Sequence, residues 1–274
     1  MRILVTNDDG IDSPGLHILA KAMKSHGDVT VVAPDREFSG SGASLGAIHS
    51  SRPEVKKTKV AGIEQSWAVS GPPALCVLYC RLGVFGDPFD LVVSGINPGC
   101  NVGHSIYHSG TVGAVLTARV GNIHGVAVSQ AAPGWDLESQ GDEKGFDGQC
   151  WDSAAEITSI VVSELLSDLN QKVVAINLNV PNLPVELMQG WKETSLGTDP
   201  LRRLSGATLE PKPEDEGSYQ VDINWGEVGP LDPATDGGAV MQGWVSATWL
   251  GHLTDISSPQ KNTVSKALDH CFNQ

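Results

Sequence analysis

Two adjacent carboxylates, Asp8 and Asp9, follow the first apolar run of the chain in the segment ILVTNDDG. Like charges this close repel each other, and a divalent cation between them removes the conflict. Carboxylate oxygens favour Mg²⁺, Mn²⁺ or Ca²⁺ over zinc, which prefers His and Cys. A helix cap at Asp9 beside a solvated acid would need no metal. Together with the polar groups described next, the pair predicts a divalent-metal site.

Further polar groups lie at the ends of two later apolar runs: Asp35, Ser39 and Ser41 in the first, and Ser94, Asn97 and Asn101 in the second. The carboxyl ends of parallel strands line the ligand crevice of an open sheet. We therefore expect these groups to meet Asp8 and Asp9 around one point. Their hydroxyl and amide oxygens complete a set of oxygen ligands suited to a hard cation.

A candidate anion site is the run HSGTVGA, in which Ser109, Gly110 and Thr111 precede a predicted helix. The first N–H groups and the positive dipole end of a helix favour phosphate. We expect His108, the residue before this run, to face outward. Arg36 is the single basic residue of the first two motif loops, so metal and backbone would neutralise most of a phosphate's charge. This combination predicts metal-assisted hydrolysis of a phosphomonoester.

The elements that position these residues follow a β-α-β pattern. Residues 2–7 read as a strand, Ser13 as a helix cap, the following residues as a helix ended by Gly27, and residues 28–35 as a second strand. Alternation of this kind continues to about residue 180 and predicts an α/β fold with a Rossmann-like, doubly wound, mostly parallel sheet. We expect residues 1–184 to form the catalytic core.

Residues 185–274 have a different texture, with short β-like runs and recurring tryptophans. We expect them to form an extended β-hairpin with an acidic tip and a C-terminal helical tail at residues 262–272, continuous with the core. Such appendages reach a neighbouring subunit or pack locally.

Composition excludes several classes of protein. The chain has 274 residues and a formal net charge of −14, which argues against a nucleic-acid partner. No stretch reaches the roughly 18 apolar residues of a membrane span, and the first residues lack the apolar region of a signal peptide. The five cysteines lack disulfide-scaffold spacing and are expected to be free thiols in the cytoplasm.

The segments ILVTNDDGIDSPG, VVAPDREFSGSGASL, DLVVSGINPGCNVG and YHSGTVGAV resemble, in this order, the motifs of the SurE family of survival-protein nucleotidases. A weaker similarity continues at NLNVPNLP and TDGGAVMQGWVSATWL. The resemblance implies a divalent-metal-dependent 5′/3′-nucleotidase with broad phosphomonoesterase activity. It also implies a homodimer or homotetramer assembled through the hairpin and the C-terminal segment.

The resemblance further implies the site residues. One divalent cation, Mg²⁺ or Mn²⁺, would be held by Asp8, Asp9, Ser39 and Asn97, and the phosphate would be contacted by Asn101, Ser109, Gly110 and Thr111. Asp8, Asp9 and Asn97 would be catalytic. In this hypothesis Asp9 accepts a proton from the attacking water, and Ser109 and Thr111 stabilise the phosphate oxygens.

Several positions depart from the family pattern, among them Pro72, Leu75, Phe38, Ala43 and Arg119. They remove no predicted metal ligand, but they leave substrate preference and rate open. One alternative is therefore a SurE-like protein that binds a metal and a phosphorylated small molecule with weak or no turnover. A dinucleotide-binding oxidoreductase would need G-x-G-x-x-G in the first turn, where this chain has two acids. An aspartyl-phosphate phosphatase would usually space its carboxylates two apart.

Overall fold

The computed structural model describes residues 1–46, 48, 52–132, 148–169, 172–199, 202–213, 215, 217–253, 264–266, 268 and 271. Most of the loop expected at residues 131–149 lies outside these ranges. The same is true of the C-terminal tail, of which residues 264–266, 268 and 271 are described as helical.

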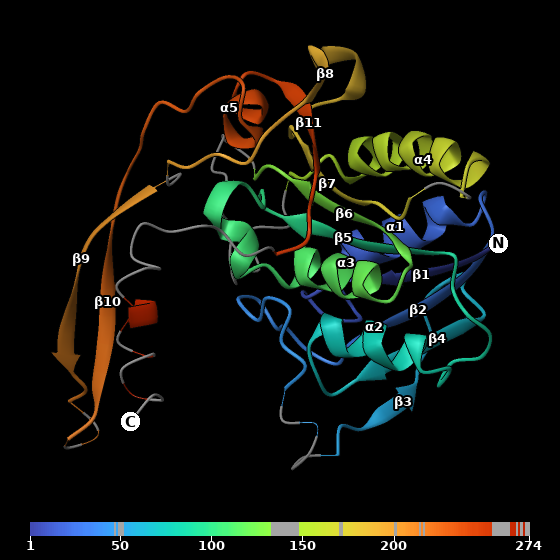
Figure 1. Cartoon of the computed structure of the whole chain (residues 1–274), viewed down its shortest axis with the longest axis horizontal. Helices are drawn as coiled ribbons and strands as arrows, with labels where there is room; N and C mark the ends of the chain where they lie inside the picture. The colour runs from blue at the N-terminus through green and yellow to red at the C-terminus, as the bar shows by residue number, and fades with distance from the viewer. Residues whose placement is uncertain are drawn as a thin grey trace.

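A nine-stranded sheet forms the centre of the described structure, with the strand order β3-β4-β2-β1-β5-β6-β7-β11-β8 (Figure 1). Its strands are β1 (Arg2–Thr6), β2 (Asp28–Pro34), β3 (Val55–Lys57), β4 (Gln65–Val69), β5 (Leu91–Pro98), β6 (His124–Gln130), β7 (Ala175–Val180), β8 (Gly190–Glu193) and β11 (Trp244–Trp249). The six strands from β4 to β7 pair in parallel, whereas β3 pairs antiparallel with β4 and β11 antiparallel with β7. The predicted α/β fold class is confirmed.

The strand order reverses beside β1, which fixes where a ligand can bind. From β1 the chain adds β2 and β4 on one side, and then returns to place β5 and β6 on the other. Ile3 of β1 is in register with Val29 of β2 and with Leu91 of β5. The carboxyl ends of β1 and β5 therefore lie next to each other at the switch point, where doubly wound sheets bind their ligands.

Helices cover both faces of the sheet (Figure 1). The helices are α1 (Pro14–Met23), α2 (Pro73–Arg81), α3 (Gly110–Val120), α4 (Trp151–Ser167) and α5 (Asp236–Met241), with short 3₁₀ helices at Gly103–Tyr107 and Val185–Leu187. Alternate residues of β1 serve the two faces. Ile3 and Val5 pack with α1 and α4, whereas Leu4 packs with α2 and α3.

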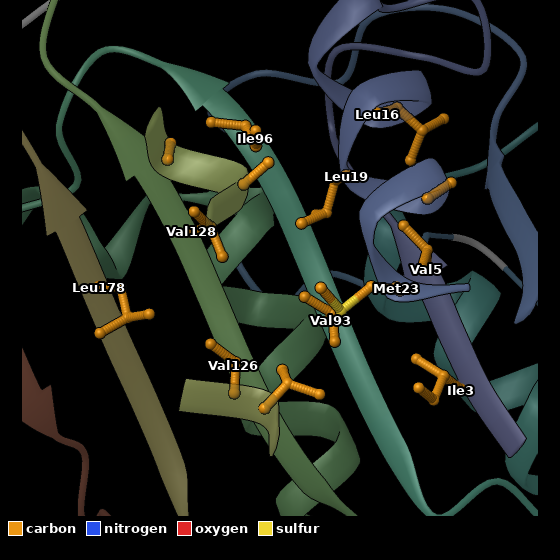
Figure 2. Close-up of a cluster of buried hydrophobic side chains, with 14 of the residues drawn as sticks. Ile3, Val5, Leu16, Leu19, Met23, Val93, Ile96, Val126, Val128 and Leu178 are labelled. Carbon is orange, nitrogen blue, oxygen red and sulfur yellow. The ribbon is translucent and has the colours of Figure 1, made fainter. Parts of the chain in front are cut away.

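The core beneath α1 shows why the helical periodicity of the sequence was informative. Leu16, Leu19 and Met23 of α1 are fully buried in one cluster with residues of β1 and β5, and Met23 lies beside Val93 of β5 (Figure 2). Burying side chains of this size stabilises the fold by about 1.5–3 kcal/mol each. The helix itself ends at Met23, before the predicted Gly27. Ser13 occupies the cap position, but its side chain makes no capping hydrogen bond.

The last third of the chain contributes both to the sheet and to a projection from it. Strands β8 and β11 extend the nine-stranded sheet beyond β7. Strands β9 (Arg202–Pro211) and β10 (Tyr219–Val228) form a separate two-stranded antiparallel hairpin that extends away from the sheet (Figure 1). The predicted extended hairpin is confirmed. None of the described helices is long and apolar enough to cross a membrane.

Candidate metal and phosphate site

Three loops at the carboxyl edge of the sheet are bonded to one another through their backbones. Phe38 N–H, after β2, donates to the Asp8 carbonyl at 2.7 Å, and Gly42 N–H donates to the His108 carbonyl at 2.9 Å. Gly110 N–H, at the start of α3, donates to Asp8 Oδ2 at 3.0 Å. The loops after β1, β2 and β5 thus converge, as the sequence predicted. Three of the polar residues expected at the meeting point, Asp35, Ser41 and Ser94, do not line the cavity described next.

A small polar cavity of about 30 Å³ lies where the three loops meet. Its lining consists of Asp8, Asp9, Ser39, Gly40, Asn97, Pro98, Asn101, Ser105, His108 and Ser109. All four predicted metal ligands therefore line the same cavity. Two of the predicted phosphate contacts, Asn101 and Ser109, line it as well. The volume suits an ion and a water-sized group.

A larger hollow of about 760 Å³ lies between α4 and the strands β7, β8 and β11. Mostly apolar side chains line it, such as Ile160, Trp191 and Trp249. It contains none of the residues predicted to do chemistry. The small polar cavity is therefore the candidate functional site.

Asp8 is almost fully buried, with 3% of its surface exposed, and the start of α3 surrounds its carboxylate. Besides Gly110 N–H, the Thr111 hydroxyl donates to Asp8 Oδ1. Burial raises the pKa of Asp8, while these hydrogen bonds act in the opposite direction. The positive end of α3 favours the ionised form as well.

Asp9 lies in a less favourable environment for a negative charge. Burial raises the pKa of Asp9 well above its usual range, and the nearby carboxylates of Asp8 and Glu37 raise it further. Its Oδ2 atom is buried and has no hydrogen-bond partner among the described residues. The ion pairs of the described residues are Arg36–Asp35 and Lys56–Glu54, so neither acid of the cavity has a cationic side chain as partner.

These features fit a divalent cation held by oxygen atoms. Asn97 Nδ2 donates to the Gly99 carbonyl at 2.7 Å, so the Asn97 amide oxygen, which Thr111 Oγ1 approaches at 3.4 Å, is the atom that could bind a cation. Ser39 adds a hydroxyl to the lining. Within the described residues no three His, Cys, Asp or Glu side chains cluster as a metal site. The proposed set contains only two such side chains, Asp8 and Asp9, so it does not count as a cluster of three. Its other ligands are an amide and a hydroxyl, and all of its oxygens are of the kind that a hard cation prefers.

The remaining predicted contacts divide into two groups. Asn101 and Ser109 line the cavity, and Ser109 Oγ accepts from Val112 N–H at 3.1 Å, which leaves its hydroxyl proton for another acceptor. Gly110 and Thr111 are not in the lining, and their donors are directed at Asp8. In this structure the start of α3 thus stabilises a predicted metal ligand, and a phosphate role for Gly110 and Thr111 stays a prediction.

Sequence reasoning did not single out Ser105, and it placed His108 facing outward. His108 is exposed, as expected, but it also lines the cavity. Ser105 lies within the 3₁₀ helix Gly103–Tyr107, an element that the glycine-rich sequence did not suggest, and His108 directly follows it.

Fold and cavity together define an α/β protein with an acidic, oxygen-lined site at the switch point of its sheet. The family model described as "Survival protein SurE" matches residues 3–203. The chain belongs to the SurE family.

Curated relatives and a solved structure agree with this assignment. "5′-Nucleotidase SurE" of Dehalococcoides mccartyi strain CBDB1 is 39% identical over 196 residues, which cover 72% of this chain and 69% of the relative. The protein of the same name from Alkalilimnicola ehrlichii is 34% identical over 259 residues, covering 90% and 88%. The crystal structure of the SurE protein from Aquifex aeolicus superposes with a TM-score of 0.74 at 30% identity, over 99% of both chains. Family membership implies a requirement for a divalent metal.

Proposed function

We propose that this protein is a divalent-metal-dependent phosphomonoesterase that hydrolyses nucleoside monophosphates. The observation that carries the proposal is the convergence of Asp8, Asp9, Ser39 and Asn97 on one polar cavity at the switch point. The names of the relatives, 5′-nucleotidase SurE, support the reaction class and the nucleotide substrate. A SurE-like protein without turnover is not favoured, because no departure from the family pattern removes a residue of this set.

Mg²⁺ or Mn²⁺ is the cation that we propose for the four oxygen ligands. When bound, the ion would supply electrostatic stabilisation of the phosphate and lower the pKa of water. Asp8, which Gly110 and Thr111 orient, would hold the cation in its ionised form. Asp9, whose Oδ2 atom has no hydrogen-bond partner among the described residues, is the group that we propose to accept the proton of the attacking water.

The part of the cavity lining formed by Asn101 and Ser109 is proposed to bind the phosphate. Asn101 and Ser109 offer polar groups there, and Ser109 retains its hydroxyl proton as a donor. Donors fixed in place before the reaction stabilise the charge that develops on the phosphoryl oxygens. The nucleoside lies outside the cavity, because about 30 Å³ holds no more than the reacting groups. We therefore expect the site to be selective for the phosphate group and tolerant of the organic group attached to it.

The test is a phosphatase assay on AMP, GMP and a chromogenic phosphomonoester, with Mn²⁺, with Mg²⁺ and with a chelator. We expect metal-dependent phosphate release that Asp8→Asn lowers by roughly 100-fold or more, since the substitution removes a charged ligand. The fold should survive, because the Thr111 hydroxyl can accept a hydrogen bond from the new amide. Silence with every common divalent ion would favour the non-catalytic binding protein, and near-wild-type rates in Asp8→Asn would contradict the ligand role.

A homo-oligomer assembled through the β9–β10 hairpin is part of the proposal. Leu209 is paired with Val221 across the hairpin, and Tyr219 and Ile223 lie two residues to either side of Val221. Side chains directly opposite each other, and those two apart along a strand, share a face of the ribbon. These four side chains are 42–69% exposed. An apolar face of this kind, which the other described residues leave exposed, suits contact with a second copy.

A further inference from the structure

Two sequence motifs have no role in the chemistry described so far: NLNVP, at the end of β7, and TDGGA, at the start of α5. Both contact the loop that carries the phosphate side of the cavity. Asn177 Nδ2 and Asn179 Nδ2 donate to the Asn101 carbonyl at 2.8 and 3.0 Å. Two residues further along the loop, Gly103 N–H donates to Asp236 Oδ2 at 2.8 Å.

Asp236 joins this loop to the segments on either side of the hairpin. Its Oδ1 atom accepts from Gly197 N–H at 3.0 Å, before β9, and from Gly237 N–H at 2.9 Å, after β10. Its own N–H donates to the Ser195 carbonyl at 2.9 Å. One carboxylate thus fixes three chain segments, and both strands of the hairpin leave the body of the protein near α5 (Figure 1).

The environment of Asp236 supports a specific role for its carboxylate. The residue is 1% exposed, and neither ion pair of the described residues includes it. Burying a carboxylate without a cation is unfavourable unless hydrogen bonds compensate, and here three backbone N–H groups do so. A neutral side chain could not satisfy all three donors in the same way.

Gly103 is fitted to this contact. Its φ of +52° lies in the left-handed region, and a Cβ atom at this position would lie 2.8 Å from the Gly197 carbonyl oxygen. The backbones of the two loops can approach each other here only because residue 103 has no side chain. Val102 packs beside it on Val240 of α5.

We propose that Asp236 is a positioning residue for the phosphate side of the cavity: it holds the loop of Asn101, Ser105 and His108 against the root of the hairpin. This inference rests on the proposed hydrolase function. The predicted metal ligands lie outside the segment that Asp236 holds. Asp8, Asp9 and Ser39 belong to other loops, and Asn97 precedes Asn101 in the chain. Loss of Asp236 should therefore weaken substrate binding and leave metal binding intact.

The experiment compares the wild type with Asp236→Asn and with the control Asp232→Asn, whose exposed carboxylate accepts from Ala234 N–H at 2.9 Å. Asn keeps the volume of the side chain but turns an N–H group toward one of the three donors. We expect the KM for AMP to rise about 10- to 100-fold, the usual range when a residue that orients a site is lost. The Mn²⁺ dissociation constant should change less than about twofold. The control should match the wild type in both.

Amide hydrogen exchange on the metal-free proteins gives a readout that does not depend on activity. Gly103 and Gly197 should be protected in the wild type and should lose at least about tenfold of this protection in Asp236→Asn. The β1 and β5 amides should keep theirs. A wild-type Gly103 amide that exchanges as a free loop amide would overturn the proposal, whether or not the variant folds.

Two other results would also overturn it: a variant with unchanged KM and protection, or a parallel loss of Mn²⁺ affinity and of protection throughout the sheet, which would mark general destabilisation. If the wild type hydrolyses no phosphomonoester with any divalent ion, the proposed function fails. The exchange data still test whether the Asp236 carboxylate holds the Gly103 and Gly197 amides.

Discussion

Asn101 and Asn179 pair through two hydrogen bonds that run in opposite directions. Asn101 N–H donates to Asn179 Oδ1 at 2.8 Å, and Asn179 Nδ2 donates to the Asn101 carbonyl at 3.0 Å. The side-chain amide of β7 thereby takes the place of a neighbouring strand for one residue of the loop. Both residues are buried, so water cannot replace either partner if one of these hydrogen bonds is lost.

Asn179→Asp removes the donor of this pair and places a carboxylate oxygen against the Asn101 carbonyl. We expect the variant to lose about 1–3 kcal/mol of stability and to bind substrate more weakly, because a buried carbonyl loses a partner. Chemical denaturation and the KM for AMP measure the two effects. Asn224→Asp, on the exposed hairpin, is the matched control. A variant with wild-type stability and KM would show that the pair does not hold the loop.

Asp9→Asn should have opposite effects with and without metal. In chelator near neutral pH the variant should be more stable than the wild type by about 1 kcal/mol or more, because Asn in the folded state needs neither a bound proton nor a charge beside Asp8 and Glu37. Adding Mn²⁺ should stabilise the variant much less than it stabilises the wild type, because one ligand of the cation is missing. Thermal melts of both proteins, with Asp12→Asn as an exposed control in the same loop, measure this. A full Mn²⁺-induced shift in Asp9→Asn would exclude Asp9 as a ligand.

The raised pKa values of Asp8 and Asp9 contribute to the pH dependence of stability, and the raised pKa of Asp236 adds to it in the same direction. The folded metal-free protein holds these protons above the ordinary pKa of 3.8, at which the unfolded chain releases them. Its stability therefore falls as the pH rises from that value through the raised folded pKa values, by at most about 1.4 kcal/mol per pH unit for each proton. Mn²⁺ binds the ionised acids, so its stabilising effect should grow over the same window.

Melts between about pH 5 and about pH 8, with chelator and with Mn²⁺, test this sign. Asp9→Asn should flatten the chelator curve. Stability in chelator that rises with pH in the wild type would contradict the proposed cause.

Gly110 allows α3 to approach Asp8. A Cβ atom at position 110 would lie 2.8 Å from both Cβ and Oδ2 of Asp8 and 2.9 Å from Ser41 Oγ. Gly110→Ala should therefore displace the carboxylate and weaken Mn²⁺ binding by about tenfold or more, as measured by calorimetry. Gly229→Ala, where a Cβ atom would meet nothing within 4 Å, serves as control. Equal Mn²⁺ affinity in the two variants would show that this close approach is not needed.

The apolar face of the hairpin should control the oligomeric state. Val221→Lys places a charge at the centre of that face, whereas Gln220→Lys places it on the polar face. Loss of one buried valine side chain should weaken the free energy of association by about 1.5–3 kcal/mol, which lowers the association constant roughly tenfold or more. Sedimentation velocity should show a smaller particle for Val221→Lys and wild-type mass for Gln220→Lys. If the two variants sediment alike, the hairpin does not form the contact.

Much of the fold was predictable because its signals are local. The alternation of apolar strands with helices of period 3.6 is contained in short windows, and it predicted β1, α1 and β2 in order and the helix α3 after Ser109. The end of α1 was misplaced by four residues, since Met23 is the last residue of the helix and Gly27 belongs to the turn that follows. The convergence of Asp8, Ser39 and Asn97 on one cavity followed from the rule that parallel strands share one carboxyl edge.

The sequence by itself thus determined the strand-end residues of the site, because strand position and polarity are local properties. Tertiary structure alone decided which partners orient them. Asp8 is held by Thr111, Asn101 by Asn179 and Gly103 by Asp236, across 103, 78 and 133 residues of chain. Contacts over such separations depend on strand order, on register and on the close approach of glycine backbones. No local periodicity encodes these, and so they arise only when the whole sheet is assembled.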